Sequence, residues 1–311
     1  MPNAVKEIPC RAAEDFLSAL DRGNPLWEGK MQFWAFRGHS DDSYKLIPTA
    51  LRAAPDMAQL GYTHNIKVGV QTTNKKQIDA EFQRIHEFYW LTDSQGLNIP
   101  GDSYLLRTPA GWRELKKKIQ ADGWPLDDLL PLLAIAQHYS VPTRLLDWSD
   151  SPLVAAFFAA RKTAEKPTGS HLSVWALNLD WIINEAFPGG SSKTIKKMPV
   201  YIITAPRATN PNLHAQGGVF TTENLVKNDF YRKVSVRSVN TLVEKKWKAT
   251  KSAKPVMVHI TLPVGEASKL IRLLNQVQIN SATLFPGYQG VAEALYERKY
   301  WDKRKKATYW L

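Results

Sequence analysis

Alternating apolar and polar residues along several short stretches of the chain predict β-strands. In Phe33-Trp34-Ala35-Phe36-Arg37 the alternation predicts a strand that ends at Gly38, with Arg37 on the same face as Phe33 and Ala35. This places Arg37 at the mouth of a strand. Residues 143–148 also have a strand-like pattern, and further strands are predicted at residues 171–179, 200–205, 218–222 and 256–262.

Apolar residues at helical spacing predict helices between these strands. Residues 76–89 should form a helix that carries Glu81, and residues 127–139 should form a second helix with His138 at its C-terminus. Ser151 followed by Pro152 is typical of a helix start and predicts an apolar helix through residue 161. Closing helices are expected at residues 266–277 and 286–298. Helices and strands that do not alternate regularly predict an α+β fold.

The composition of the chain is typical of a globular protein with a sizeable core. With 311 residues, 44% of them hydrophobic, it should form one large domain or two close-packed ones. The single cysteine, Cys10, excludes an intramolecular disulfide framework and a thiolate-rich zinc site, and we expect no metal. The densest apolar stretches, residues 126–136 and 152–160, are too short to span a bilayer. We therefore expect a cytoplasmic protein without membrane contact.

The chain is basic, with a formal net charge of +12, and its positive residues occur in runs. These runs lie at residues 116–118, 193–197, 245–254 and 298–306. Aromatic residues such as Trp247 and Tyr300 accompany two of the runs, which suits stacking on nucleic-acid bases. The runs are equally compatible with solvated loops, so a surface for nucleic acid or an acidic protein is one of two open interpretations.

An arginine directly before a glycine at a strand end is suited to anion binding. The guanidinium fork of Arg37 can hold a carboxylate or a phosphate, and Gly38 would allow a ligand close to the backbone. A structural salt bridge from Arg37 to Glu81 or Asp147 is the alternative interpretation. The same two interpretations apply to Arg52.

The stretch Gln137 to Trp148 is more informative, because polar and aromatic groups alternate with apolar ones between two apolar helices. Most of these polar groups must be satisfied inside the protein or by a ligand. His138 could contact an anionic ligand or cap the helix carbonyls. Arg144 and Asp147 are three residues apart and face opposite sides of a strand, so each needs another partner. We expect this stretch and Phe36-Arg37-Gly38 to line one polar pocket.

Together these blocks resemble the FRG domain family, which is named after the tripeptide Phe36-Arg37-Gly38. The resemblance rests on residues 34–40, 46–52, the helix with Glu81, 136–159, 215–221 and 279–287. It implies an N-terminal helical extension over residues 1–29, an FRG domain over 30–300 and a basic, aromatic C-terminal tail over 301–311. Ser140 stands where the family often has glycine, and the chain has an extra glycine after Gln216.

The FRG layout is similar to that of ADP-ribosyltransferases. The resemblance implies a mixed, mainly antiparallel sheet core flanked by helices, with NAD as the substrate. The residues it suggests for catalysis are Arg37, Thr143 and Gln216, with Glu223 as an alternative to Gln216, and His138 at its helix end is a further candidate. The residues it suggests for contact with the nucleotide are Phe36, Arg37, Gly38, Tyr139, Arg144, Asp147 and Trp148.

This arrangement suits cleavage of the nicotinamide–ribose bond of NAD. A guanidinium can hold the pyrophosphate, aromatic side chains can enclose the nicotinamide, and a polar group near the ribose can stabilise the developing charge. The protein would then be an effector, such as a toxin or an antiphage protein, that modifies an acidic acceptor. A non-catalytic nucleotide- or nucleic-acid-binding module is the second hypothesis. A nucleic-acid hydrolase that uses His138 and Asp147 is the third.

Overall fold

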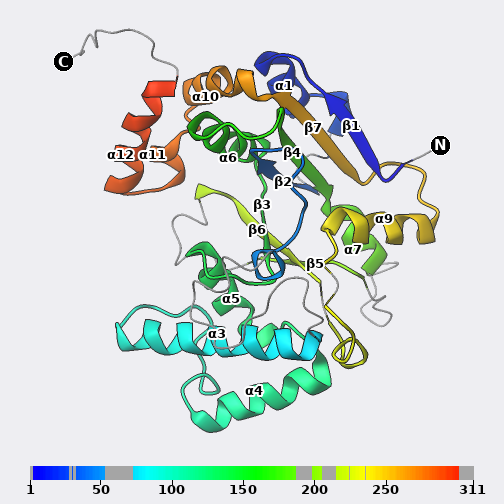
Figure 1. Ribbon diagram of the computed structural model, residues 1–311, viewed down its shortest axis with the longest axis vertical. Helices are drawn as coiled ribbons and strands as arrows, with labels where there is room; N and C mark the ends of the chain where they lie inside the picture. The colour runs from blue at the N-terminus through cyan, green and yellow to red at the C-terminus, as the bar shows by residue number, and fades with distance from the viewer. Residues whose placement is uncertain are drawn as a thin grey trace.

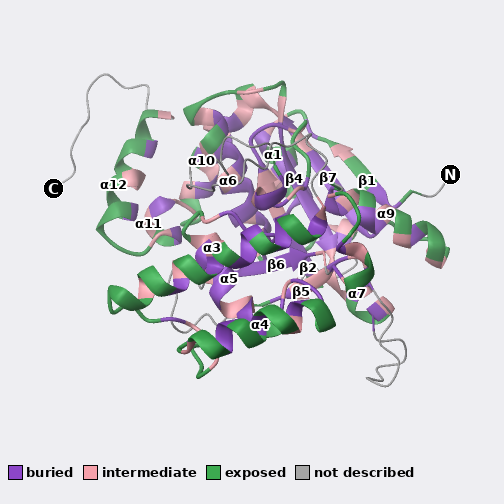
Figure 2. Ribbon diagram, turned by 60° about the horizontal axis from the view of Figure 1, so that its bottom comes forward, coloured by how far each residue is buried: buried purple, intermediate pink, exposed green. Residues whose placement is uncertain are grey.

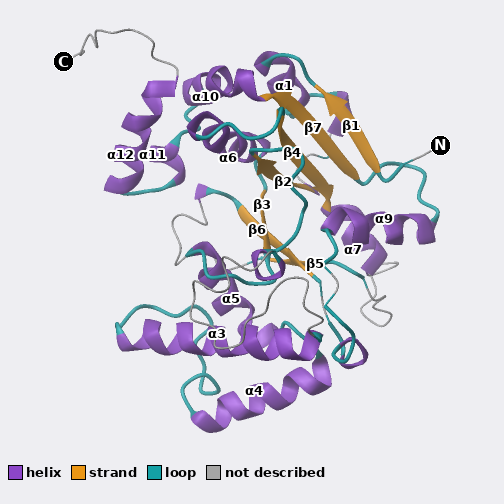
Figure 3. Cartoon of the chain, in the orientation of Figure 1, coloured by secondary structure: helices purple, strands orange, loops and turns teal. Residues whose placement is uncertain are grey.

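The structure is a computed structural model that describes residues 3–27, 30, 33–52, 73–186, 198–204, 215–223, 225–234 and 236–300. Within these ranges the chain forms a mixed sheet in the order β1-β7-β4-β2-β3-β6-β5 (Figures 1 and 3). The strands are β1 (Val5–Pro9), β2 (Trp34–His39), β3 (Leu146–Ser149), β4 (His171–Asn178), β5 (Tyr201–Ile203), β6 (Gly218–Thr222) and β7 (Met257–Pro263).

The pairing of these strands is mainly antiparallel. Only β1 and β7 run parallel among the described strands, with Val5 opposite Met257. The central strand β2 lies between β4 and β3, and pairs Arg37 with Trp175 on β4. The predicted α+β class, with a mainly antiparallel sheet flanked by helices, is therefore confirmed.

Helices cover both faces of the sheet and extend from one of its ends. The longer ones are α1 (Ala13–Ala19), α3 (Asn74–Ser94), α4 (Pro109–Asp122), α5 (Leu130–His138), α6 (Pro152–Glu165), α7 (Leu179–Ala186), α9 (Val239–Thr250), α10 (Ala267–Gln276) and α12 (Tyr288–Glu297). Short turns of helix are α11 (Ser281–Leu284), η1 (Pro25–Trp27), η3 (Thr49–Leu51), η4 (Asp127–Leu129), η6 (Lys227–Asp229), η7 (Val264–Glu266) and η8 (Arg298–Tyr300).

Three clusters of buried side chains hold these layers together (Figure 2). The first joins α1, α6 and α10 to one face of β2, β4 and β7, and the third joins α7 and α9 to the opposite face. The second lies within α3, α4 and α5 and reaches Phe220 on β6. Alternation along β2 explains this division, because Phe36 belongs to the first cluster and Ala35 to the third.

Most of the predicted elements are present, with shifts at their ends. The strand expected at residues 143–148 starts only at Leu146, since Thr143 is held in the preceding loop, where its carbonyl accepts the amide of Ala50 at 3.1 Å. The helix bearing Glu81 runs further than expected, to Ser94. The sequence patterns did not indicate β1, α4, α7 or α9.

The N-terminal segment differs from the helical extension predicted for residues 1–29. Residues 3–27 include helix α1, but they also include strand β1, which forms five residue pairs with β7 at the edge of the sheet. The segment is therefore not purely helical, because it completes the sheet. The tail predicted at residues 301–311 lies outside the described residues, as does the basic run at residues 193–197.

Gly38 sets how closely β2 and α6 approach each other. A β-carbon at this position would lie 2.0 Å from the carbonyl oxygen of Ala155 and 2.9 Å from the amide nitrogen of Ala159, both in the backbone of α6. Such contacts are impossible for any side chain, so the helix packs directly on the strand only because residue 38 is glycine. The space that a β-carbon would occupy at Gly38 is thus filled by α6.

Candidate functional site

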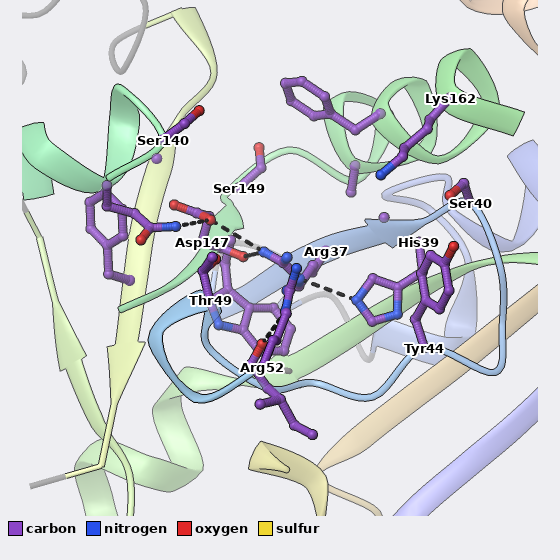
Figure 4. Close-up of a pocket in the computed structure, with 18 of the residues that line it drawn as sticks. Arg37, His39, Ser40, Tyr44, Thr49, Arg52, Ser140, Asp147, Ser149 and Lys162 are labelled. Atoms are coloured by element: carbon purple, nitrogen blue, oxygen red, sulfur yellow. Dashed lines mark hydrogen bonds and ion pairs between the residues drawn. The ribbon is translucent and has the colours of Figure 1, made fainter. Parts of the chain in front are cut away.

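The two sequence segments singled out above meet around one cavity of about 1470 Å³ (Figure 4). β2 contributes Phe36 to His39, and the region from α5 to β3 contributes Gln137, His138 and Asp147 to Ser149. The loop after β2, one side of α6 and the segments around Gln216 and Phe285 complete the wall. The expected shared pocket is therefore present in the fold.

Arg37 lies at the centre of this cavity, held in place by three contacts. Its Nη1 donates to the backbone carbonyl of Asp147 at 2.6 Å and lies 3.5 Å from Oδ2 of the same residue. Its Nε donates to Nε2 of His39 at 3.2 Å. Burial lowers the pKa of Arg37, and so does the nearby charge of Arg52, while Asp147 raises it. Because a guanidinium stays charged in proteins, the cavity contains a positive charge that is poorly solvated.

His39 supports Arg37 as a neutral ring. Since its Nε2 accepts the hydrogen bond from Arg37, its proton resides on Nδ1. Burial, together with the positive charges of Arg37 and Arg52, lowers the pKa of His39 to about 3. The ring is 5% exposed and lies edge-on to Tyr44, with centroids 6.2 Å apart. A neutral His39 orients the guanidinium without adding charge.

Further cations surround Arg37. Arg52, Lys45, Arg161 and Lys162 also line the cavity, against two carboxylates, Asp147 and Glu165. The Nε of Arg52 donates to the carbonyl of Ile47 at 2.9 Å, which directs the guanidinium toward the same space as Arg37 (Figure 4). Arg161 is neutralised by Glu293 at 2.8 Å and by Glu297 at 3.3 Å. The lining remains positive and suits an anionic ligand.

Asp147 is the carboxylate nearest the centre of the cavity. Its Oδ2 accepts a hydrogen bond from Nε2 of Gln137 at 2.9 Å, in addition to the contact with Arg37. Its side chain is 46% exposed, so it faces solvent space rather than the protein interior. His138, beside it on α5, has a lowered pKa because of burial, although Asp147 raises it. A half-exposed carboxylate and a neutral histidine therefore share one side of the cavity.

Arg144 does not belong to the cavity, contrary to its expected contact with the nucleotide. It is fully buried against Glu81, with its Nε 3.0 and 2.8 Å from the two carboxylate oxygens. Glu81 also accepts hydrogen bonds from Gln77 at 2.7 Å and from the indole of Trp124 at 2.6 Å. This network joins α3 to the loop before β3. Of the two acids considered as partners of Arg37, Asp147 is therefore the one in contact.

Thr143 also acts inside the protein rather than in the cavity. It is 1% exposed, donates to Oε1 of Gln137 at 2.8 Å and accepts the amide of Leu145 at 3.0 Å. Since Gln137 in turn donates to Asp147, Thr143 orients the amide that holds this carboxylate. Thr143 therefore reaches the cavity lining only through its hydrogen bond to Gln137.

The remaining candidates divide between the cavity and other locations. Gln216 lines the cavity, and its Nε2 donates to the carbonyl of Leu284 at 3.1 Å. Trp148 lines it with a buried ring whose Nε1 donates to Thr221 at 2.8 Å. Glu223 lies outside the lining and pairs with Arg237, and burial raises its pKa. Tyr139, expected as an aromatic wall, is 64% exposed and also lies outside the lining.

Two departures from the family pattern have a conformational basis. Ser140, at a position where glycine is common, has φ +63° directly after α5, in the left-handed region that favours glycine. The extra glycine, Gly217, has φ +57°, and a β-carbon there would lie 1.8 Å from Oδ1 of Asp150. The doubled glycine therefore permits the turn that places Gln216 in the wall.

Sequence reasoning did not find His39, Lys162, Phe158 or Phe285 as lining residues. The sequence could have identified His39, because a residue two positions after Arg37 in a strand faces the same side. The other three enter the wall only through the packing of α6 and α11 around the cavity. No periodic pattern marks them.

The fold and the cavity define an α+β protein with a cationic cavity beside its central strand. Residues 32–168 match the model of the FRG domain family, so the chain contains an FRG domain. The match covers β2 through α6, including Arg37, Arg52 and Asp147, whereas Gln216 lies beyond it. No curated protein and no solved structure matches the chain.

Two further observations concern metals and membranes. Among the described residues, no group of three or more His, Cys, Asp or Glu side chains is arranged to hold a metal ion. Within the same residues, no helix combines the length and apolar character needed to cross a bilayer.

Proposed function

We propose that the cavity binds NAD and that the protein cleaves its nicotinamide–ribose bond, transferring ADP-ribose to an acceptor or to water. The observation that carries this proposal is the Arg37 guanidinium beside the half-exposed carboxylate of Asp147, with Arg52 and Lys162 in the same cavity lining. Two guanidiniums and an ammonium suit the two negative charges of a pyrophosphate. Asp147 supplies the opposite charge that the reacting ribose requires.

The chemistry follows from this distribution of charge. As the bond between ribose C1′ and the nicotinamide nitrogen breaks, its electron pair leaves with nicotinamide and C1′ becomes positive. The carboxylate of Asp147 stabilises that charge, since a fixed opposite charge in a partly desolvated site acts most strongly in the transition state. A nucleophile then attacks C1′ and loses a proton. His138, kept neutral by burial, accepts that proton.

Asp147 takes the place that the resemblance gave to Gln216 or Glu223. Gln216 has no charge, and Glu223 is paired with Arg237 outside the cavity lining. Gln216 lines the wall and is left with a positioning role toward the substrate. Thr143 acts through Gln137, which holds Asp147.

Binding is tested with ADP-ribose and two arginine variants. Arg52 is exposed and donates from Nε to a backbone carbonyl, so Arg52→Ala should preserve the fold. Loss of a charge-assisted contact should weaken ADP-ribose binding about tenfold or more, measured by calorimetry. Arg232→Ala is the matched control, because Arg232 is 74% exposed, pairs with Asp229 and lies outside the cavity lining. Equal weakening in both variants would contradict the assignment.

Catalysis is tested by the release of nicotinamide. Asp147→Asn should lower the release rate about a hundredfold while ADP-ribose still binds. Asp128→Asn, which removes another acid paired with a cation, should leave the rate unchanged. If wild-type protein releases no nicotinamide with water, nucleic acids or cell lysate as acceptors, the enzymatic proposal is wrong.

A non-catalytic nucleotide-binding module is the second proposal. The observation that favours it is that Gln216, which lines the wall, is a neutral amide and brings no negative charge to a reacting ribose. In that case Arg52→Ala weakens nucleotide binding, and the wild-type protein itself releases no nicotinamide. Under either proposal the exposed lysines of residues 245–254 attract an acidic acceptor or nucleic acid, as an effector such as a toxin or antiphage protein would require.

A further inference from the structure

The cavity has two ends with different chemistry. At the α5 end, His138 lines it together with Val141 and Pro142, which follow it closely in the chain. At the α6 end, the rings of Phe158 and Phe285 line it, next to Lys162. The cavity also exceeds the range of about 300–1,000 Å³ that is usual for small-molecule sites. An extended ligand can therefore reach from one end to the other.

The wall at the α6 end is fixed in place. The rings of Phe158 and Phe285 meet edge to face, with centroids 6.0 Å apart, and both remain partly exposed. The guanidinium of Arg161 lies over the Phe285 ring, 5.6 Å from its centroid. Arg161 is itself held by Glu297, which is 2% exposed and hydrogen-bonded to Ser281. A wall tied to α6, α11 and α12 in this way is preorganised for an aromatic ligand.

Asp147 determines which end each ring of a dinucleotide would occupy. Its Oδ2 is bound by Gln137, in the last turn of α5, so the reacting ribose belongs at the α5 end. Lys162 lies on the other side of Arg37 from Ser140, which directly follows the α5 helix cap (Figure 4). The second ring of the ligand must then extend past Arg37 toward α6.

We infer that the α6 end is a binding site for a purine nucleoside phosphate, with adenine against Phe158 and Phe285 and the phosphate beside Lys162. This inference rests on the proposed function for the orientation of the ligand. It adds that the protein recognises the adenine half of its substrate, which takes no part in the reaction. Aromatic walls favour bases over bare sugars because every base has a π face.

The test compares AMP with ribose 5-phosphate, which share the sugar and the phosphate and differ in the base. By calorimetry on the full chain, AMP should bind wild-type protein about tenfold more tightly than ribose 5-phosphate. Phe285→Leu and Phe158→Leu keep an apolar side chain and should bring this ratio close to one. Tyr296→Leu is the matched control, because Tyr296 is 71% exposed on α12, and it should keep the full ratio.

The inference is overturned if wild-type protein binds the two compounds equally or binds neither, or if both phenylalanine variants keep the ratio. These outcomes are distinct from those of the proposed function. A preference for AMP without any nicotinamide release would leave the base site standing and refute NAD cleavage. Nicotinamide release without a preference for AMP would refute the base site and leave NAD cleavage standing.

Discussion

Replacing His39 by glutamine should remove a defined part of the acid sensitivity of the fold. The folded protein holds His39 neutral, with a pKa of about 3, whereas the ordinary value of 6.5 applies to the unfolded chain. Below about pH 6.5 the unfolded state therefore binds a proton that the folded state refuses. Stability from this residue is complete above about pH 6.5 and is lost as the pH falls toward 3.

The magnitude follows from the two pKa values. Lowering the pH from about 7.5 to about 5 should cost roughly 2 kcal/mol through His39 alone, because each pH unit below the unfolded pKa contributes about 1.4 kcal/mol. His39→Gln cannot take up the proton, and its Oε1 can still accept the hydrogen bond from Arg37. Between about pH 7.5 and about pH 5, the unfolding free energy of His39→Gln should therefore fall by roughly 2 kcal/mol less than that of the wild-type protein.

The measurement is urea unfolding of both proteins at a series of pH values, with the unfolding free energy taken from the midpoint and the slope. The difference between the two curves isolates His39, since every other titrating group is common to both proteins. Parallel curves between about pH 7.5 and about pH 5 would show that His39 is not held neutral in the folded state, and the account of Arg37 orientation would fail with it.

Three further predictions concern stability and are measured by the same unfolding assay. Glu81→Gln leaves the buried Arg144 without its counter-charge and should cost about 3–5 kcal/mol of unfolding free energy. The control Glu114→Gln removes one partner of an exposed pair and should cost less than about 1 kcal/mol. Similar losses in the two variants would contradict the value for Glu81. Gly38→Ala forces α6 away from β2 and should cost about 3 kcal/mol or more, whereas Gly265→Ala meets no atom within 4 Å, so a similar loss there would refute the packing argument. Ser140→Gly relieves a left-handed backbone and should raise the unfolding free energy by about 0.5–1 kcal/mol; a decrease would show that the serine side chain is needed.

Periodicity in the sequence predicted the elements that bury one regular face. β6 was expected and found at residues 218–222, and α6 starts at the Ser151–Pro152 cap, where the serine hydroxyl accepts the amide of Val154. These elements need only local information. By contrast, β1 is five residues long and is stabilised by β7, about 250 positions away, so no local pattern could reveal it.

The candidate site was predictable to the extent that its residues lie on predicted elements. Arg37, at the mouth of a predicted strand, and Asp147, in the polar stretch of residues 137–148, were expected to share a pocket, and both line the cavity. The partner of Arg144 could not be assigned from sequence, since Glu81 is 63 residues away and is brought to it by the packing of α3 on α5. Pairing of buried charges depends on tertiary structure, and periodicity carries no information about it.

The alternation of a strand sets the surroundings of each residue in the tripeptide Phe36-Arg37-Gly38. Phe36 points into the core beneath α6, Arg37 points to the opposite face beside Asp147, and Gly38 admits the backbone of the helix. A register shift of one residue would turn the guanidinium of Arg37 toward the apolar cluster. The packing of Phe36 and Gly38 therefore fixes the position of Arg37, so the charge at the centre of the cavity is placed by the core rather than by a loop.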